Sequence, residues 1–413
     1  MSDFDLPIGA IPSSWSVAEL KEVTSKIGSG ATPRGGAKVY RDEGTAFIRS
    51  QNVLDNEFSV RGLVHIDDDA ADALSGVSVL PGDVLFNITG DSILRTCVVP
   101  DSVLPARVSQ HVAIIRSNGS VDPLFLQKYL TIPAVKEYML GHSAGGTRKA
   151  ITKGHIEGFV VPLPPLPEQR AIAEVLGALD DKIESNRRIV ELGVRLARLL
   201  VSQGESSVRL GDIATIQKGL SYKGSGLEES PEAGIPMVNL ANFSTLGWMV
   251  PSGLKYYSGD HKGKHTLGPW DVVVANTDLT QQRSILGRAA LVPPSLDGSI
   301  FTHHVNLIRF AESEENTMRL AVWGQLNSPA FRERAEGFAT GTTVAGLPVD
   351  ALLDFEMKMP RVDDVNAAEL VLMGVWSAES ESVRLEATRD ALLPALLSGR
   401  IRGPAAAELV EAS

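Results

Sequence analysis

The sequence predicts an α+β fold with an internal pseudo-twofold repeat. Two similar domains, each a mixed and mostly antiparallel sheet with helices, are separated by two long helices that form an antiparallel coiled coil. Three observations predict this fold: segments that recur about 193 residues apart, short β-branched runs between turn residues, and two long segments with helical periodicity. At 413 residues the chain also exceeds one ordinary core, because domains usually hold about 100 to 200 residues.

The repeat organises the whole chain. "SQHVAIIR" in the first half is echoed by "THHVNLIR" in the second, so His111 matches His304 and Arg116 matches Arg309. The other matches keep the same order: "LRTCVVP" (94–100) with "GRAALVP" (287–293), "PGDVLFN" (81–87) with "GPWDVVVAN" (268–276), and "VAELKEVTSKIGSG" (17–30) with "VRLGDIATIQKGLS" (208–221). A long helical segment closes each half, which predicts the order domain, helix, domain, helix.

Each domain shows both strand and helix patterns. Runs such as "VAII", "DVLF", "DVVVAN" and "VNLIRF" are bounded by Gly, Pro, Asp and Asn, which is typical of strands between turns. One helix candidate follows in each domain, at 122–140 and 316–335. A proline near the middle of each candidate should kink or split it.

The central long helix starts from the proline-rich "PLPPLP" at 162–167. Pro167 suits the first turn of a helix, and the negative charge of Glu168 interacts favourably with the positive end of the helix dipole. A helix of about 33 residues would be roughly 50 Å long at 1.5 Å per residue. Asn186 and Gly193 occupy two places in an apolar stripe whose other members are Ile172, Leu176, Leu179, Ile183, Val190, Ala197 and Leu200.

The second long helix is predicted over 365–399, with a patchier apolar stripe. Pro394 should end or bend its last turn. Half-apolar helices of this length are marginal alone, so the two should pair, and the domain between them makes the pairing antiparallel. The stripe consists of Leu372, Val375, Trp376, Val383, Ala387, Ala391 and Leu397.

These patterns divide the chain into five segments. We predict a first α+β domain at 1–161, a central helix at 162–203, a second α+β domain at 204–360, a distal helix at 361–401 and a flexible tail at 402–413. The net charge of −11 argues against a protein whose whole surface grips a polyanion, although local basic clefts stay possible. Cys97 is the single cysteine, so we expect no zinc site. No run of about 18 apolar residues could span a membrane, so we expect a cytoplasmic protein.

Two similar domains at a set distance suit a ligand that repeats along an axis. Double-stranded DNA presents the same face about every 34 Å, so it is the favoured ligand. A plain structural spacer or dimerisation stalk remains the alternative interpretation of the helix pair.

The chain resembles the specificity subunits of type I restriction-modification systems over nearly its whole length. The resemblance rests on "IGSGATPRGGAKVYRDEGTAFIRSQNV" (27–53), on "FVVPLPPLPEQRAIAEVLGALDDKIE" (159–184) and on "RDALLPALLSGRI" (389–401). The second half departs from the family pattern, because "MKMPRVDDVNAAEL" lacks the "PLPPLPEQ" signature.

The resemblance implies a subunit without catalytic residues. Each target-recognition domain would read half of a bipartite DNA site, and the helices would space the domains and dock two methyltransferase (modification) subunits along their charged flank. Restriction/translocase subunits would join the larger complex. The resemblance implies no cofactor or metal in this chain, S-adenosylmethionine in the methyltransferase, and ATP and Mg in the restriction subunit.

Two other functions stay open. A self-contained methyltransferase or nuclease would need catalytic motifs, yet no Asn-Pro-Pro-aromatic motif occurs, and "IGSG" is followed by a turn rather than a helix. Glu356 and Lys358 approach a nuclease pattern, but Val160 and Pro162 stand at the matching positions, so a strand explains them better. A scaffold that does not bind DNA is the third function considered.

The repeat also sorts candidate DNA contacts. Domains that read different half-sites should share their scaffold and differ where they contact bases, so the matched histidines and arginines at 111/304 and 116/309 are expected to be structural. Arg pairs with guanine and Asn or Gln with adenine, while Lys more often meets phosphate. The candidates are Arg34, Lys38, Arg49, Gln51, Asn52, Arg95, Arg148, Lys149 and Lys153 in the first domain, and Asn239, Asn242, Lys255, Lys262, Lys264, Asn276, Thr277, Gln281, Gln282 and Arg283 in the second.

Overall fold

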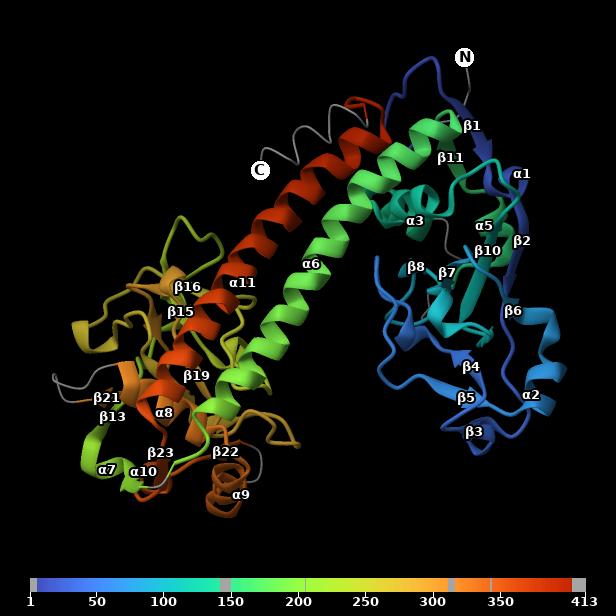
Figure 1. The fold of residues 1–413 in the computed structure, drawn as a ribbon. Helices are drawn as coiled ribbons and strands as arrows, with labels where there is room; N and C mark the ends of the chain where they lie inside the picture. Colours follow the sequence, from blue (N-terminus) through green and yellow to red (C-terminus); the bar gives the residue numbers. More distant parts are fainter. Residues whose placement is uncertain (1–5, 142–149, 205, 311–315, 342–343, 403–413) are drawn as a thin grey trace. The chain divides into compact units, whose positions relative to one another are not determined.

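The chain forms two compact units that share both long helices. The computed structural model describes residues 6–141, 150–204, 206–310, 316–341 and 344–402. The first unit comprises residues 1–184 and 383–413, and the second comprises residues 185–382. Both α6 (Leu166–Leu200) and α11 (Val362–Leu397), the central and distal long helices, contribute one half to each unit (Figure 1). The division into target domains and helices therefore stays a prediction, since the compact units cut across it.

The first unit is built on two sheets and a short strand pair. An antiparallel sheet has the order β2-β10-β7-β8, and a second sheet has the order β3-β5-β4-β9-β6, in which β4 and β9 are parallel. The strands are β1 (Ser16–Glu19), β2 (Thr24–Ser29), β3 (Tyr40–Arg41), β4 (Thr45–Ile48), β5 (Val64–Ile66), β6 (Ser78–Val79), β7 (Val84–Asn87), β8 (Thr96–Val98), β9 (Ala106–Val108), β10 (Val112–Ser117) and β11 (Val160–Leu163), with β1 paired to β11.

The second unit repeats this topology. Its antiparallel sheet has the order β13-β21-β17-β19, and its second sheet has the order β14-β16-β15-β20, again with one parallel pair, β15 and β20. The duplication predicted from the sequence is thus a duplication of the fold. The strands are β12 (Ser206–Arg209), β13 (Ala214–Lys218), β14 (Leu227–Glu228), β15 (Ile235–Val238), β16 (Lys255–Tyr257), β17 (Val272–Ala275), β18 (Thr277–Asp278), β19 (Ala289–Leu291), β20 (Ile300–Phe301), β21 (Val305–Phe310), β22 (Ala345–Gly346) and β23 (Glu356–Met359).

Proline splits the helix of each domain, as its fixed φ and missing N–H require. In the first unit Pro133 begins a new helix, and in the second unit Pro329 does, with Ser328 as its N-cap. The short helices are α1 (Leu20–Val23), α2 (Asp68–Ala73), α3 (Pro123–Thr131), α4 (Pro133–Gly141), α5 (Lys153–Glu157), α7 (Leu210–Ile213), α8 (Asn316–Leu326), α9 (Pro329–Phe338) and α10 (Val349–Leu353). Within the described ranges, no helix combines the length and the apolar character needed to cross a membrane.

The long helices run antiparallel in both units. In the first unit the start of α6 packs with the end of α11, where Leu176 and Leu396 share one core. In the second unit the end of α6 packs with the start of α11, where Val194 and Leu372 share another. Nine apolar members of the two predicted stripes are buried: Ile172, Leu176, Leu179, Ile183, Ala197, Leu372, Val375, Trp376 and Leu397; Val190 and Leu200 are half-buried.

The apolar stripe predicted for the distal helix is wrong over residues 383–391. Val383 is 60% exposed, and Ala387 and Ala391 are exposed as well. The inward positions there follow a spacing of three and four residues through Glu379, Ser382, Glu386 and Arg389 to Leu393 and Leu396, all of them buried or half-buried. Because the middle of the inward face is polar, an apolar stripe could not mark it.

Close packing of the helices in the second unit depends on Gly193. A Cβ atom at this position would overlap Val375 Cγ2, and a Val side chain on a helix has little freedom to move away. We expect Gly193→Ala to destabilise the chain by about 1–3 kcal/mol through this overlap. Gly374→Ala is the matched control, because nothing lies within 4 Å of its added methyl, and it should stabilise the helix by up to about 1 kcal/mol. Urea unfolding midpoints measure both, and equal shifts would contradict the close contact.

A buried carboxyl group makes the second unit sensitive to pH. Glu379 on α11 accepts a hydrogen bond of 2.6 Å from Trp248 Nε1, and burial raises the pKa of its carboxyl from 4.5 to about 7. The folded state therefore binds a proton that the unfolded state releases above pH 4.5, so stability falls as pH rises from about 4.5 to 7. At pH 8 the ionised carboxylate lowers the stability of the folded protein by on the order of 3 kcal/mol, and we expect Glu379→Gln to remove this destabilisation. Melting temperatures at pH 5 and 8 test this; a Glu379→Gln protein that keeps the wild-type pH dependence would contradict it. Glu174→Gln, on the exposed side of α6, is the control.

Candidate nucleic-acid interface

Both units carry a polar surface pocket at the same end of the antiparallel sheet. In the first unit the pocket has a volume of about 400 Å³ and lies beside His111, which directly precedes β10. In the second unit the pocket has a volume of about 350 Å³ and lies beside His304, which directly precedes β21. Two candidate residues, Gln51 and Arg95, line the first pocket, and two others, Asn276 and Thr277, line the second.

The same hydrogen bond stands in both pockets. Thr89 Oγ1 lies 2.8 Å from His111 Nδ1, and Thr277 Oγ1 lies 2.8 Å from His304 Nδ1. Each threonine also forms a backbone bridge to the segment after the domain's main helices, at Ala150 in the first unit and at Gly346 in the second. Burial, together with the nearby His303 and Lys255, lowers the pKa of His304.

The connection beside each pocket differs between the units. Residues 88–95 join β7 to β8 with 8 residues, whereas residues 276–288 join β17 to β19 with 13. The longer loop contains Gln281 and Gln282, which are exposed, and Arg283, which is half-buried with a positive φ of 47°. These three candidates therefore lie together in a loop at the sheet end whose length differs between the two units.

Hydrogen bonds to its backbone atoms stabilise the longer loop, residues 276–288. Asp278 is 1% exposed, and its carboxylate accepts from the backbone N–H groups of Thr280 and Ile285. Arg332 on α9 donates to the backbone carbonyls of Arg283 and Leu286. Because these contacts use backbone atoms of the loop, the exposed side chains of Gln281 and Gln282 are left to contact a ligand, whereas Arg283 Nη2 donates to Gly341 O at 3.4 Å.

Three asparagines proposed for DNA contact are structural instead. Asn52 and Asn242 are fully buried, and each accepts from the backbone N–H three residues before it while donating to two carbonyls of the following segment. They end matching 3-10 turns, η2 (Ser50–Asn52) and η6 (Leu240–Asn242). Asn239 is 9% exposed and bonds to Gly253 O and Ala241 N. Their amides are used to close turns, so they cannot read bases without unfolding them.

The remaining candidates are spread over several surfaces. Arg34 and Lys38 are exposed after β2, and Arg49 lies over the Tyr40 ring at 5.4 Å. Lys153 forms an ion pair with Glu157 at 3.4 Å, and Lys255 Nζ lies 2.9 Å from Tyr222 Oη. Arg148 and Lys149 lie outside the described residues.

Lys262 and Lys264 lie away from the second pocket. The carbonyl of Lys264 accepts from Arg309, near the end of β21, whereas His304 precedes the start of this strand. Five strand residues separate these ends by roughly 17 Å. The two lysines therefore belong to a different surface from that of Asn276 and Gln281.

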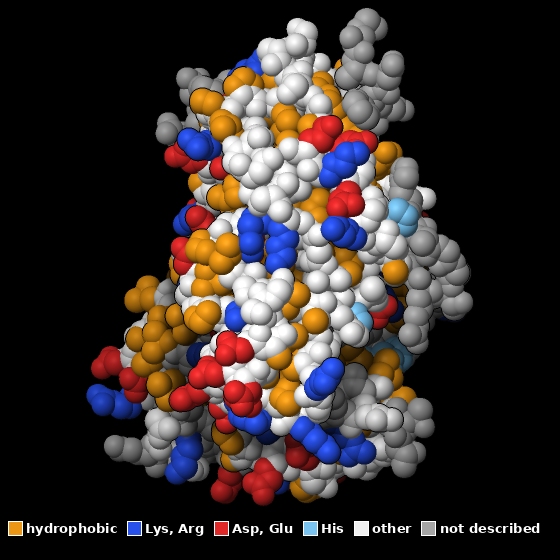
Figure 2. Space-filling model, turned by 90° about the vertical axis from the view of Figure 1, so that its right-hand side faces the viewer, with side chains coloured by type: hydrophobic (Ala, Val, Ile, Leu, Met, Phe, Trp, Pro, Cys, Tyr) orange, Lys and Arg blue, Asp and Glu red, His pale blue; other side chains and the backbone are white. Residues whose placement is uncertain are grey.

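The matched arginines hold the scaffold together at that opposite end. Arg116 makes two bonds to Asp83, at 2.7 and 2.8 Å, and the Asp83 side chain is fully buried. Arg309 lies 3.9 Å from Asp271, the matching carboxylate. On the face shown in Figure 2, basic and acidic side chains are interspersed, so no large single-sign patch covers it.

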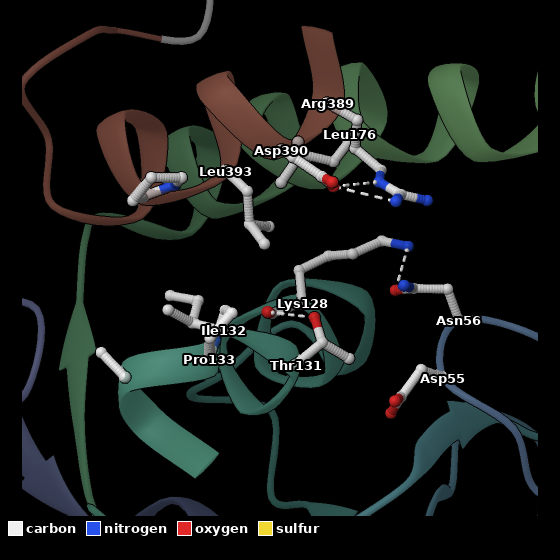
Figure 3. A pocket seen from close by; sticks show the side chains of 12 residues that line it. Asp55, Asn56, Lys128, Thr131, Ile132, Pro133, Leu176, Arg389, Asp390 and Leu393 are labelled. Carbon is white, nitrogen blue, oxygen red and sulfur yellow. Dashed lines mark hydrogen bonds and ion pairs between the residues drawn. The ribbon is translucent and has the colours of Figure 1, made fainter. Parts of the chain in front are cut away.

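A third cavity, of about 490 Å³, lies in the first unit between α3 and the long helices (Figure 3). Lys128 reaches into it, donating to Asn56 Oδ1 at 3.0 Å and forming an ion pair with Asp180. Arg389 donates to the same aspartate at 3.0 Å. These buried charges are paired with one another, so the network attaches the first domain to its helices rather than forming a ligand site. No sequence pattern predicts this network, because its members are far apart in the chain.

Glu356 and Lys358, which approach a nuclease pattern in the sequence, lie on the strand β23. Glu356 and Lys358 alternate on β23, where they pair with Arg209 and Ser207, as Val160 and Pro162 on β11 pair with Glu19 and Val17. Within the same ranges, no three His, Cys, Asp or Glu side chains come together as a metal site would need.

Comparisons with known proteins agree with this architecture. Residues 12–192 match the family model described as type I restriction modification DNA specificity domain. A putative type I restriction enzyme MjaX specificity subunit from Methanocaldococcus jannaschii is 35% identical over 189 residues, which cover 44% of this chain and 40% of the relative. The chain thus spans less than half the length of that relative. The MjaVIII specificity subunit of the same organism is 21% identical over 71% of this chain and 74% of its own length.

A solved structure shares the fold over nearly the whole chain. The crystal structure of a type I restriction-modification system S subunit from M. genitalium matches with a TM-score of 0.60 and 13% identity, covering 94% of this chain and 96% of that one. At this identity the likeness concerns the fold alone.

Proposed function

We propose that this chain is the DNA-recognition subunit of a type I restriction-modification complex, because residues 12–192 match the DNA specificity domain of such systems and a specificity subunit is 35% identical over 189 residues. Each of its two domains reads one half of a bipartite site in double-stranded DNA, and the helix pair sets the distance between the halves. The chain itself carries no catalytic step. A methyltransferase subunit that uses S-adenosylmethionine, and a restriction subunit that uses ATP and Mg, supply the chemistry.

One observation carries the proposal: two copies of one fold differ in the length and the side chains of the loop at the same sheet end. Residues 88–95 and 276–288 have different lengths and side chains, whereas the strands around them share one topology. This is the pattern expected when a shared scaffold presents different contacts to two different half-sites.

The proposal is tested by selecting bound duplexes from a random DNA library with the chain and its modification subunits. We expect a motif of two short specific parts separated by a gap of fixed length. The purified chain alone should not transfer methyl groups to DNA. Methylation by the chain alone would favour a self-contained enzyme, and a complex without sequence preference would favour a scaffold.

We further propose that two modification subunits dock on the long helices, one of them on an exposed apolar stripe of α6. Ile189, Leu192, Leu196 and Leu199 are 46%, 66%, 48% and 64% exposed and recur at a spacing of three and four residues. Arg188 and Arg195 flank this stripe, and Arg195 is paired with Glu191 at 2.6 Å. An apolar stripe with a charged border suits a protein partner, since exposed apolar surface of this kind usually marks an interface.

Replacing Leu192 and Leu196 with Glu is expected to prevent the modification subunit from copurifying, because carboxylates would enter an apolar contact. The helix should still form, as both positions are exposed in the chain alone. The control is Val60→Glu, which places the same change at a 69% exposed site in the first domain. A double variant that assembles like the control would refute this docking site.

A further inference from the structure

The Thr–His pairs are shared between the domains but are not part of the buried scaffold. His111 is exposed and His304 is half-buried, and both border pockets that open to solvent. The shared Arg116–Asp83 pair differs, because its carboxylate is fully buried. Burial of a charge requires a partner, whereas an exposed imidazole needs none for stability. The preservation of an exposed pair in both domains therefore calls for an explanation other than packing.

The neighbours of each pair are not shared. Gln110 precedes His111, whereas His303 precedes His304 with ring centroids 4.0 Å apart. The cation beside the first pocket is Arg95, and the cation beside the second is Lys218. Because the Thr–His pair is the same in both domains while its neighbours differ, it suits binding to a feature that both half-sites have in common.

We propose that each Thr–His pair binds a phosphodiester group of the DNA backbone, one in each half-site. The phosphate is the one part of the two half-sites that does not change with base sequence. The threonine Oγ1 and the histidine Nδ1 of each pair lie 2.8 Å apart. When the imidazole is protonated, Nδ1–H donates to the threonine oxygen, and the threonine O–H and the imidazole Nε2–H are then both left to donate to phosphate oxygens. Arg95 and Lys218 add positive charge to the respective pockets. This inference rests on the proposed DNA-recognition function and assigns these residues to the backbone rather than to the bases.

One group in the first pocket opposes an anion. Asp91 lies in the loop 88–95 and is exposed beside Arg95, whereas the described residues that line the second pocket include no carboxylate. Removal of this charge offers a variant that should act in the opposite direction to removal of the histidine.

The test uses the complete complex with its modification subunits and a cognate duplex. We expect His111→Ala and His304→Ala each to weaken binding about tenfold, equally for cognate and non-cognate DNA, since a lost phosphate contact carries no sequence information. Asp91→Asn should strengthen binding to both DNAs. Thr89→Val and Thr277→Val, which keep the imidazoles and nearly the same side-chain volume, should weaken binding in the same uniform way.

A scan of single methylphosphonate substitutions identifies the contacted phosphates. The wild-type complex should lose affinity at one position in each half-site, and His111→Ala should become insensitive at one of these positions and His304→Ala at the other. A changed sequence preference in either histidine variant, or unchanged affinity for both DNAs in folded variants, would overturn the phosphate assignment. If the wild-type complex shows no preferred site, the proposed function itself fails, and that outcome is separate from the phosphate result.

Discussion

Replacing the tip of the second-domain loop, by Gln281→Ala, Gln282→Ala and Arg283→Gly, is expected to lower affinity for the native site by about 100-fold or more. The estimate assumes that two bidentate base contacts are lost, each contributing about 1–3 kcal/mol. Glycine at 283 accommodates the positive φ found there. Because Asp278 and Arg332 brace this loop through backbone atoms, its shape should persist. Competition binding with native and altered half-sites measures the effect.

The matched control for this loop is Lys262→Ala with Lys264→Ala. These residues lie near the opposite end of β21, so their removal should not change which half-site is preferred. Equal losses for the loop and control variants would show that the loop does not determine specificity. A loop variant that still prefers the native sequence would contradict its assigned role directly.

Inserting seven residues into both long helices should lengthen the gap between the two half-sites by about three base pairs. Seven helical residues add about 10.5 Å, and one base pair rises about 3.4 Å. A heptad preserves the spacing of inward positions such as Asn186, which donates to Glu381 at 2.8 Å in the second unit. Insertion points beside these two residues, after Asn186 in α6 and before Glu381 in α11, keep the apolar packing of each unit intact.

The altered gap is read from the methylation pattern of cells that express the variant. Insertion into α6 alone is the control, because it shifts one helix against the other and should impair assembly. A double insertion that assembles and still methylates sites with the original gap would show that the helices do not set the spacing.

Most of the fold was predictable because the repeat lies in buried strands. β10 and β21 are buried through four successive residues, so "HVAII" and "HVNLI" stayed similar enough to align the two halves. At one edge the alignment of the two halves from the sequence is shifted by one residue. Asn87 pairs with the first residue of β10 and Ala275 with the first residue of β21, so the equivalent of Asn87 is Ala275 rather than Asn276. The polar inward face of α11 was not predictable from apolar periodicity, since Glu379 and Ser382 resemble surface residues.

Individual site residues were harder to predict than the site's location. The sequence predicts that polar loop residues contact the ligand, yet Asn52 and Asn242 are buried because short turns use their amides to satisfy backbone groups. Sequence alone cannot separate an asparagine that closes a turn from one that faces solvent. Conversely, the exposed stripe on α6 was hidden, because Leu192 and Leu196 lie next to Gly193 and Ala197 in a helix that also has a buried apolar face.

The most direct test of the central claim is to map methylated adenines across a genome in cells that express this chain with its modification subunit. We predict methylation at a single bipartite motif with a fixed gap. Altering the 276–288 loop should change one half of this motif, while the other half and the gap are retained. Methylation at an uninterrupted motif, or a pattern that is the same without this chain, would contradict the account.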